Sequence, residues 1–254
     1  MKKRKQKSIL KCYNPLSSTI GYAKMPKEMV NDLNNACNEM IRGERESIDW
    51  SHNLAGKVKQ EILIPPDVGQ KWGAWLDAQI REYMKDKINN IFLPGHAPVS
   101  NVHFENGKKV STILSDKKKA LQYNSIGKIL FSTAWFVRSF SGDYNPAHRH
   151  TDCDLSCVGY LKLPDWEDEI SKDSQDNNPS NGQIEFSTGY GASKWSIHTI
   201  KVFPRVGDWY LFPSDLTHTV YPFRSDGERR SFSINIITQG GFNNKHNKEK
   251  IYTG

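Results

Sequence analysis

Apolar residues recur at helical spacing in two segments of the first third of the chain. After Pro26 they follow one another three or four residues apart until the pattern stops near Gly43, which predicts a first helix. This stripe consists of Met29, Leu33, Cys37 and Met40. A longer stripe predicts a second helix, packed on a sheet by one apolar face. Its positions are Val68, Trp72, Trp75, Leu76, Ile80, Tyr83 and Met84.

Beyond Pro94 the pattern changes to short strand-like segments that are separated by Gly, Pro and Asn. Several short strands with turn signals between them are typical of a β-sandwich or a β-barrel. The segments are 110–114, 128–140, 155–163, 183–186, 198–202, 209–212 and 230–237. The acidic and polar stretch 164–181 predicts a surface loop between two of these strands.

These patterns predict an α+β protein that is mainly β and has three parts. Residues 1–20 are basic and polar, which predicts a flexible N-terminus. Residues 21–95 form the predicted helical annex packed on the barrel, and residues 96–254 form the predicted β domain. A chain of 254 residues with 37% hydrophobic residues is long and apolar enough for such a core.

Charge and cysteine content narrow the classes of function only slightly. The formal net charge is +7, and basic runs near both ends could contact an acidic partner or could simply be solvated. Four cysteines without paired spacing predict free thiols in a reducing compartment. No apolar run reaches the roughly 20 residues that span a bilayer. We therefore expect a cytoplasmic protein that does not associate with membranes.

A cluster of metal-binding residue types gives the strongest chemical signal. His148, His150, Asp152 and Asp154 alternate along one short segment, and His218 follows a later strand signal. Side chains two apart on a strand share a face, so His148 and His150, or His150 and Asp152, could bind one metal ion together with His218. Two histidines and a carboxylate with open positions are typical of non-haem Fe(II) oxygenases.

Two registers for this metal site stay open, and three of the four residues His148, His150, Asp152 and His218 are expected to be ligands. A carboxylate ligand suits Fe(II) and lowers the charge of the site, which favours His150 with Asp152. The distance from the preceding turn favours His148 with His150. Asp154 is a weaker third option.

A second candidate site lies on the last predicted strand. Arg229, Ser231, Ser233 and Asn235 alternate onto one face of it. An arginine inside a barrel needs an anionic partner, because a buried unpaired charge is very costly. A guanidinium with a serine hydroxyl beside it could hold the far carboxylate of a dicarboxylic acid. The alternative interpretation is an ordinary pair of arginines at the surface.

These motifs together resemble the 2-oxoglutarate/Fe(II)-dependent oxygenases, and more narrowly the prolyl-hydroxylase-like branch found in bacteria and tailed phages. The resemblance covers about 134–237 and rests on the histidine cluster, on 155–164, 182–186 and 204–214, and on Arg229 with Ser231. It implies a double-stranded β-helix (jelly-roll) core. It also implies Fe(II) as cofactor, with 2-oxoglutarate and O2 as cosubstrates. Arg229 would bind the C5 carboxylate of 2-oxoglutarate with help from Ser231, and Tyr160 matches a cosubstrate-binding tyrosine.

The resemblance therefore implies a hydroxylase that couples oxidative decarboxylation of 2-oxoglutarate to oxidation of another molecule. That substrate, such as a peptide side chain, a nucleic acid or a small molecule, is not identified by the sequence. No catalytic residue beyond the metal ligands is expected. If His148 is the first ligand, His150 replaces the usual carboxylate, so a cupin-like three-histidine metalloprotein that does not use 2-oxoglutarate is an alternative. A non-catalytic binding or structural protein on the same barrel is another. A phage-encoded member would act in the host cytoplasm.

Overall fold

The computed structural model describes residues 18–53, 56–90, 99–105, 108–113, 127–166, 180–189 and 197–238. The predictions for the basic runs 2–7, 117–119 and 245–250, and for most of the acidic loop, lie outside these residues. The chain divides into two compact units. In the smaller unit, the strands β3 (Val99–Glu105) and β4 (Lys108–Ile113) pair antiparallel. The larger unit, 18–81 with 128–239, contains both candidate sites.

Both predicted helices form where the apolar stripes place them. Helix α1 (Lys27–Ile41) starts directly after Pro26, and Gly43 follows its end with a φ of 73°, a conformation that glycine adopts without strain. Its apolar stripe is buried. Helix α2 (Pro66–Asn90) is longer and begins with a proline in its first turn, where the missing N–H costs nothing. Among the described helices, none is both long enough and apolar enough to cross a membrane.

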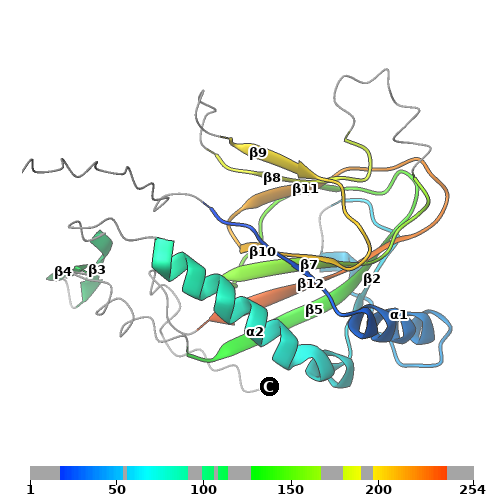
Figure 1. Ribbon diagram of the computed structural model, residues 1–254, viewed down its shortest axis with the longest axis horizontal. Helices are drawn as coiled ribbons and strands as arrows, with labels where there is room; N and C mark the ends of the chain where they lie inside the picture. The colour runs from blue at the N-terminus through cyan, green and yellow to red at the C-terminus, as the bar shows by residue number, and fades with distance from the viewer. Residues whose placement is uncertain are drawn as a thin grey trace, which may run out of the picture. The chain divides into compact units, whose positions relative to one another are not determined.

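A six-stranded antiparallel sheet forms one wall of the larger unit. Its strand order is β1-β10-β7-β12-β5-β2. The strands are β1 (Gly21–Lys24), β2 (Gln60–Leu63), β5 (Ile129–Ser139), β7 (Leu155–Lys162), β10 (Asp208–Pro213) and β12 (Arg229–Thr238). The two edge strands, β1 and β2, come from the segment predicted as a helical annex, so this segment contributes sheet as well as helices. Both helices lie on the face turned away from the second sheet (Figure 1).

A four-stranded antiparallel sheet forms the other wall, in the order β6-β11-β8-β9. Its strands are β6 (Asn145–His148), β8 (Ile184–Ser187), β9 (Thr199–Val202) and β11 (Thr217–Val220). The core between the two sheets consists of apolar side chains from both: Val158, Tyr160, Ile184, Phe186, Tyr210, Phe212 and Leu216. The prediction of a mainly β protein with few helices is confirmed. Strands β6 and β11 escaped prediction because they are short and rich in polar residues.

Candidate metal and cosubstrate site

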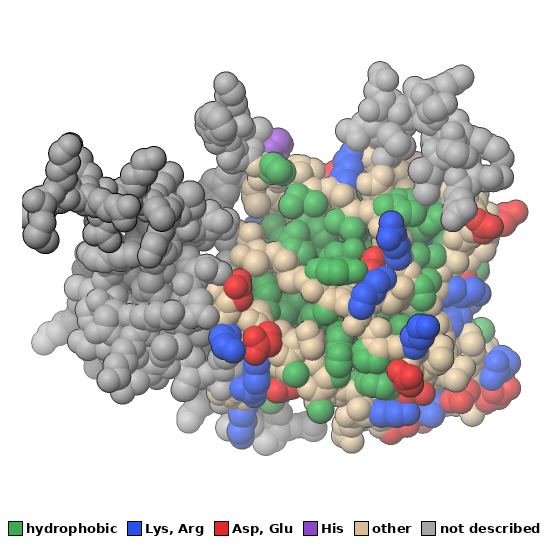
Figure 2. All heavy atoms as spheres, in the orientation of Figure 1, with side chains coloured by type: hydrophobic (Ala, Val, Ile, Leu, Met, Phe, Trp, Pro, Cys, Tyr) green, Lys and Arg blue, Asp and Glu red, His purple; other side chains and the backbone are tan. Residues whose placement is uncertain are grey.

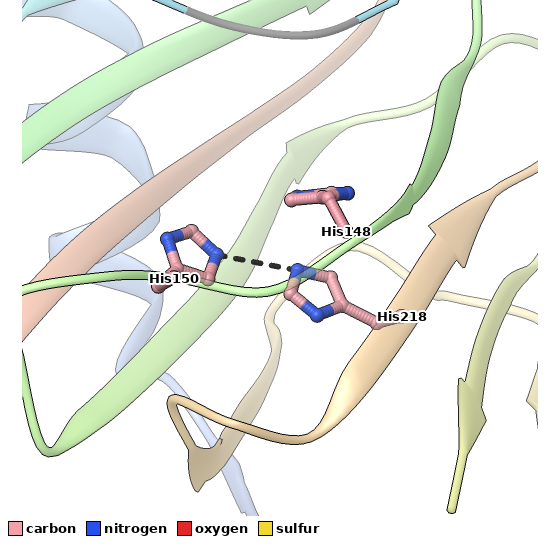
Figure 3. Close-up of side chains that lie close together, drawn as sticks. All are labelled: His148, His150 and His218. Carbon is pink, nitrogen blue, oxygen red and sulfur yellow. Dashed lines mark hydrogen bonds between the residues drawn. The ribbon is translucent and has the colours of Figure 1, made fainter. Parts of the chain in front are cut away.

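Three histidines meet at the core between the sheets, two from neighbouring strands and one from just beyond β6. His148 is the last residue of β6, His150 follows two residues later, and His218 lies on β11 directly opposite His148. One ring nitrogen from each lies within 4.8 Å of the others. The Nε2 atoms of His150 and His218 are 3.2 Å apart (Figure 3). Residues 68 positions apart in the chain therefore present nitrogen atoms to one point.

The carboxylates of the same segment are not part of this cluster. Asp152 is exposed and has a φ of 59°, and Asp154 is held by the end of β12, where its carboxylate accepts hydrogen bonds from the backbone and hydroxyl of Thr238. Strand β6 ends at His148, so the alternation of faces does not continue as far as Asp152. Of the two predicted registers, the structure assembles His148 and His150 with His218.

Local hydrogen bonds orient two of the imidazoles. The Nδ1 atoms of His148 and His218 lie 2.7 Å and 3.0 Å from the carbonyl oxygens of Pro146 and Leu216, respectively. A carbonyl can only accept, so both Nδ1 atoms carry the proton and both Nε2 atoms keep a lone pair. This is the orientation in which histidine binds a metal ion.

Burial keeps the three imidazoles neutral at physiological pH. Desolvation lowers the pKa of His148, and it lowers the pKa of His150 to about 4 and of His218 to about 3, with a further lowering from neighbouring imidazoles. Neutral nitrogen ligands of this kind suit Fe(II), Zn(II) and Ni(II). The donor set therefore fits a divalent transition metal.

The histidines line a small cavity of about 40 Å³ together with the second candidate site. Arg229 is 3% exposed, and its Nη1 atom donates to the carbonyl oxygens of Tyr221 (3.1 Å) and Gly182 (3.5 Å). Within the described part of the chain, no carboxylate lies at ion-pair distance from Arg229. Burial lowers the pKa of its guanidinium. The charge of Asp143 offsets this lowering only in part. A buried cation without an ion-pair partner among the described residues favours binding of an anionic ligand.

Hydroxyl groups lie beside this guanidinium on the same face. Ser231 on β12 pairs directly with Tyr160 on β7, and both line the cavity with Ser233. Burial raises the pKa of Tyr160, so its phenol remains a hydrogen-bond donor. Of the four residues predicted to share a face, Arg229, Ser231 and Ser233 line the cavity, and Asn235 is not among its lining residues.

Trp135 and Asn145 are among the cavity-lining residues that were not predicted from the sequence. Trp135 on β5 has its ring centroid 6.0 Å from that of His150, and Asn145 begins β6. The Trp135 Nε1 and Asn145 Oδ1 atoms are buried without a hydrogen-bond partner among the described residues. The signal for Trp135 is alternation: Trp135, Val137 and Ser139 pair with the site residues of β12. Nothing in the local sequence distinguishes Asn145 from an ordinary turn residue.

Part of the chain is similar to a known protein family. Residues 133–235 match the family model described as "Putative 2OG-Fe(II) oxygenase". This segment is therefore similar to the 2OG-Fe(II) oxygenases. The oxygenase segment runs from β5 to β12 and contains the three histidines and the arginine pocket. The prediction of an Fe(II)- and 2-oxoglutarate-dependent oxygenase, with O2 as the second cosubstrate, is therefore confirmed.

Solved structures are similar to this chain at low sequence identity. A Pseudomonas putida prolyl-4-hydroxylase has 16% identity and a TM-score of 0.50, and the match covers 88% of this chain and 95% of that chain. A Trichoplax adhaerens prolyl hydroxylase in complex with a hypoxia inducible factor peptide fragment has 11% identity and a TM-score of 0.49, covering 86% and 83%. A viral collagen prolyl hydroxylase from Paramecium Bursaria Chlorella virus-1 has 13% identity and a TM-score of 0.43, covering 85% and 94%.

The predicted resemblance to the prolyl-hydroxylase-like branch is thereby confirmed for the fold, which the bacterial enzyme supports best. No curated protein matches the chain.

Proposed function

We propose that this oxygenase binds Fe(II) through His148, His150 and His218 and anchors 2-oxoglutarate through Arg229. One observation supports the proposal above all: the three histidines line the same cavity as Arg229, a buried arginine with no carboxylate at ion-pair distance among the described residues. A keto acid that also carries a second carboxylate matches both ends of such a pocket. When bound, Fe(II) with 2-oxoglutarate and O2 supplies an oxidative decarboxylation that drives oxidation of a second molecule.

The protein residues in this proposal bind, orient and shield. Arg229 receives the C5 carboxylate through paired N–H donors, and the hydroxyls of Ser231 and Tyr160 donate to the same end of the cosubstrate. Apolar side chains from both sheets, Val158, Ile184 and Phe212, complete the walls and exclude water. The low polarity strengthens the pairing of the guanidinium with a carboxylate.

Three neutral ligands leave the full charge of the ferrous ion in the pocket. Together with Arg229 this charge favours a doubly negative cosubstrate. The rival proposal of a cupin-like three-histidine metalloprotein without 2-oxoglutarate explains the histidines but gives the buried guanidinium no role. The proposal of a non-catalytic protein on the same barrel explains neither the histidine cluster nor the buried guanidinium.

The finer classification of the fold as a double-stranded β-helix (jelly roll) is part of the proposal. The path of the chain supports this classification. From β5 onward, consecutive strands alternate between the two sheets, except for β8 and β9, which form a hairpin within one sheet. Four core strands in each sheet result: β5, β7, β10 and β12 in one, and β6, β8, β9 and β11 in the other.

To test the proposal, the protein is loaded with Fe(II) under anaerobic conditions and mixed with 2-oxoglutarate. O2 is then admitted, and turnover is measured as the formation of succinate. We expect succinate from the wild type even without a second substrate, and none from His218→Ala. Arg229→Gln should retain the metal but need about 10- to 100-fold more 2-oxoglutarate, because a charge-assisted hydrogen bond contributes about 1.5–3 kcal/mol.

Arg42→Gln is the matched control, since Arg42 is exposed and pairs only with Glu44 on the surface. A wild type that binds iron and forms no succinate, with or without candidate substrates, would support the rival metalloprotein. Unchanged 2-oxoglutarate dependence in Arg229→Gln would remove the arginine from the proposal.

The substrate class stays a prediction, with a peptide side chain as the first candidate to screen for a mass gain of one oxygen atom. We also propose a reducing, cytoplasmic setting, of a cell or of a phage-infected host. Its support is that Cys37, Cys153 and Cys157 are buried free thiols.

A further inference from the structure

A series of aromatic rings leads from the metal-binding end of the cavity to the molecular surface. The ring centroid of His218 lies 6.2 Å from that of Phe186, and the Phe186 centroid lies 6.3 Å from that of Tyr210. Tyr210 in turn lies 5.5 Å from Tyr22, which is 58% exposed. Only two rings therefore separate a buried histidine of the candidate metal site from a phenol in contact with solvent.

Tyr160 joins this series from the cosubstrate end of the cavity. It lines the cavity on β7, and its ring centroid lies 6.4 Å from that of Tyr210 on the neighbouring strand β10. Tyr22 on β1 pairs directly with Tyr210, so the two side chains share a face of the sheet. Both ends of the candidate site thus lead to Tyr210, and Tyr210 leads to the surface.

One carboxylate accepts hydrogen bonds from both phenols outside the cavity. The hydroxyl of Tyr22 donates to Asp208 Oδ1 (3.0 Å), and the hydroxyl of Tyr210 donates to Asp208 Oδ2 (3.3 Å). The Lys24 ammonium, 2.6 Å from Oδ1, favours the charged form of Asp208. A tyrosine that gives up an electron also gives up its phenolic proton, and Asp208 is a base within reach of each hydroxyl.

The proposed reaction creates a need for a path of this kind. When 2-oxoglutarate is decarboxylated and no second substrate is present, one oxygen atom of O2 enters succinate and the other remains as an oxidant in the cavity. Two electrons and two protons convert that atom to water. Without them, the side chains that line the cavity are the nearest groups to be oxidised, and preventing such side reactions is a task of the protein.

We propose that Tyr210 and Tyr22 form an electron relay that carries surplus oxidising equivalents from the cavity to the surface. The inference rests on the proposed function. In each of two passes, Tyr210 gives an electron to the cavity and regains one from Tyr22. The O–H bond of Tyr22 then breaks, and its proton passes to Asp208. A soluble one-electron reductant restores Tyr22, which takes its proton back, and the reductant leaves oxidised.

The experiment follows 2-oxoglutarate turnover by the iron-loaded full-length chain without a second substrate, in the presence of the reductant ABTS. ABTS is too large for a cavity of about 40 Å³, and its radical cation is coloured. The electron balance predicts two radical cations per succinate in the wild type. Tyr22→Phe keeps the ring but not the hydroxyl, so it should form succinate at the wild-type rate and almost no radical cation.

Two further variants separate a relay from a structural role. Tyr22→Trp should restore oxidation of ABTS, because an indole also gives up one electron. Tyr144→Phe is the matched control and should behave like the wild type. Tyr144 is also an exposed tyrosine, and its ring contacts no other aromatic ring among the described residues.

Electron paramagnetic resonance and peptide mass spectrometry give readouts that do not depend on turnover rate. In samples frozen during turnover without ABTS, we expect a tyrosyl radical signal in the wild type that is altered in Tyr22→Phe. Oxygen insertion into Tyr160 should increase in that variant. Equal oxidation of ABTS per succinate in Tyr22→Phe and the wild type would overturn the relay and leave the proposed function intact. A wild type that forms no succinate would refute the proposed function, and the relay with it.

Discussion

At the scale of single residues, Glu61 on β2 is a buried carboxyl group with no partner. Its side chain is fully buried, and neither oxygen has a hydrogen-bond partner among the described residues. Burial, with a smaller contribution from the charge of Asp49, raises its pKa to about 8. The group is therefore protonated in the folded protein at neutral pH, although it would be ionised in the unfolded chain.

Replacing Glu61 by glutamine should stabilise the protein above about pH 5. The folded chain binds a proton that the unfolded chain releases, so wild-type stability falls as the pH rises from about 4.5 to about 8. At pH 7 the penalty is on the order of 3 kcal/mol. Urea unfolding at several pH values should give a flatter profile for Glu61→Gln. The same slope as in the wild type, or an equal gain from the exposed Glu46→Gln, would contradict this account.

At the scale of secondary-structure elements, Glu228 joins three strands and a helix. Its carboxylate accepts hydrogen bonds from Arg138 on β5, Arg230 on β12 and Lys162 on β7. Arg230 in turn donates to Asn34 and Asn38 on α1. The cluster lies on the helix-covered face, and it holds the start of β12 so that the intervening Arg229 faces the cavity.

Loss of the Glu228 charge should strongly weaken this junction between the three strands and helix α1. Burial by itself would raise the pKa of Glu228, but hydrogen bonds from Arg230 and Arg138 outweigh it and lower the pKa to about 2. Its contribution is therefore complete above about pH 4.5 and is lost as the pH falls towards 2. We expect Glu228→Gln to cost about 3–5 kcal/mol at pH 7, since two arginines lose their counter-charge.

Guanidinium chloride unfolding at pH 7 measures this cost. Glu44→Gln is the control, because the Arg42–Glu44 pair is fully exposed to solvent and its loss should change stability very little. A cost in Glu228→Gln no larger than in this control would show that the cluster does not hold the junction.

At the scale of the whole molecule, the proposed site connects the two sheets. His148 and His218 belong to the four-stranded sheet, while Tyr160, Arg229 and Ser231 belong to the six-stranded sheet. Figure 2, in the orientation of Figure 1, shows apolar side chains gathered on the surface between charged ones. Because metal and cosubstrate would contact both sheets, their binding should oppose separation of the sheets.

Thermal unfolding should therefore respond to both ligands in an ordered way. Mn(II) at about 100 times its Kd should stabilise the fold by about 2.7 kcal/mol and raise the Tm by about 5–10 °C. Adding 2-oxoglutarate should raise the Tm further. His218→Ala should lose both shifts, whereas Arg229→Gln should keep the first and lose the second. A metal-induced shift that survives in His218→Ala would place the metal elsewhere.

The local pattern of residues was sufficient for the parts of this protein that depend on periodicity. Both helices follow from their apolar stripes, and the alternating positions of β12 correctly predict that Arg229, Ser231 and Ser233 share a face. Both predicted registers also bring His150 and His218 to one site, as the structure does. The spacing of side chains along a helix or strand is a property of the backbone, so the sequence encodes it directly.

Tertiary structure alone decided the rest. The choice of His150 with His148, and not Asp152, depends on where β6 ends, and that end is set by its pairing with β11. The burial of Glu61 depends on β2 joining the edge of a sheet formed by distant strands. Each of these is a long-range contact, and contacts between distant segments leave no periodic trace in the segments that make them.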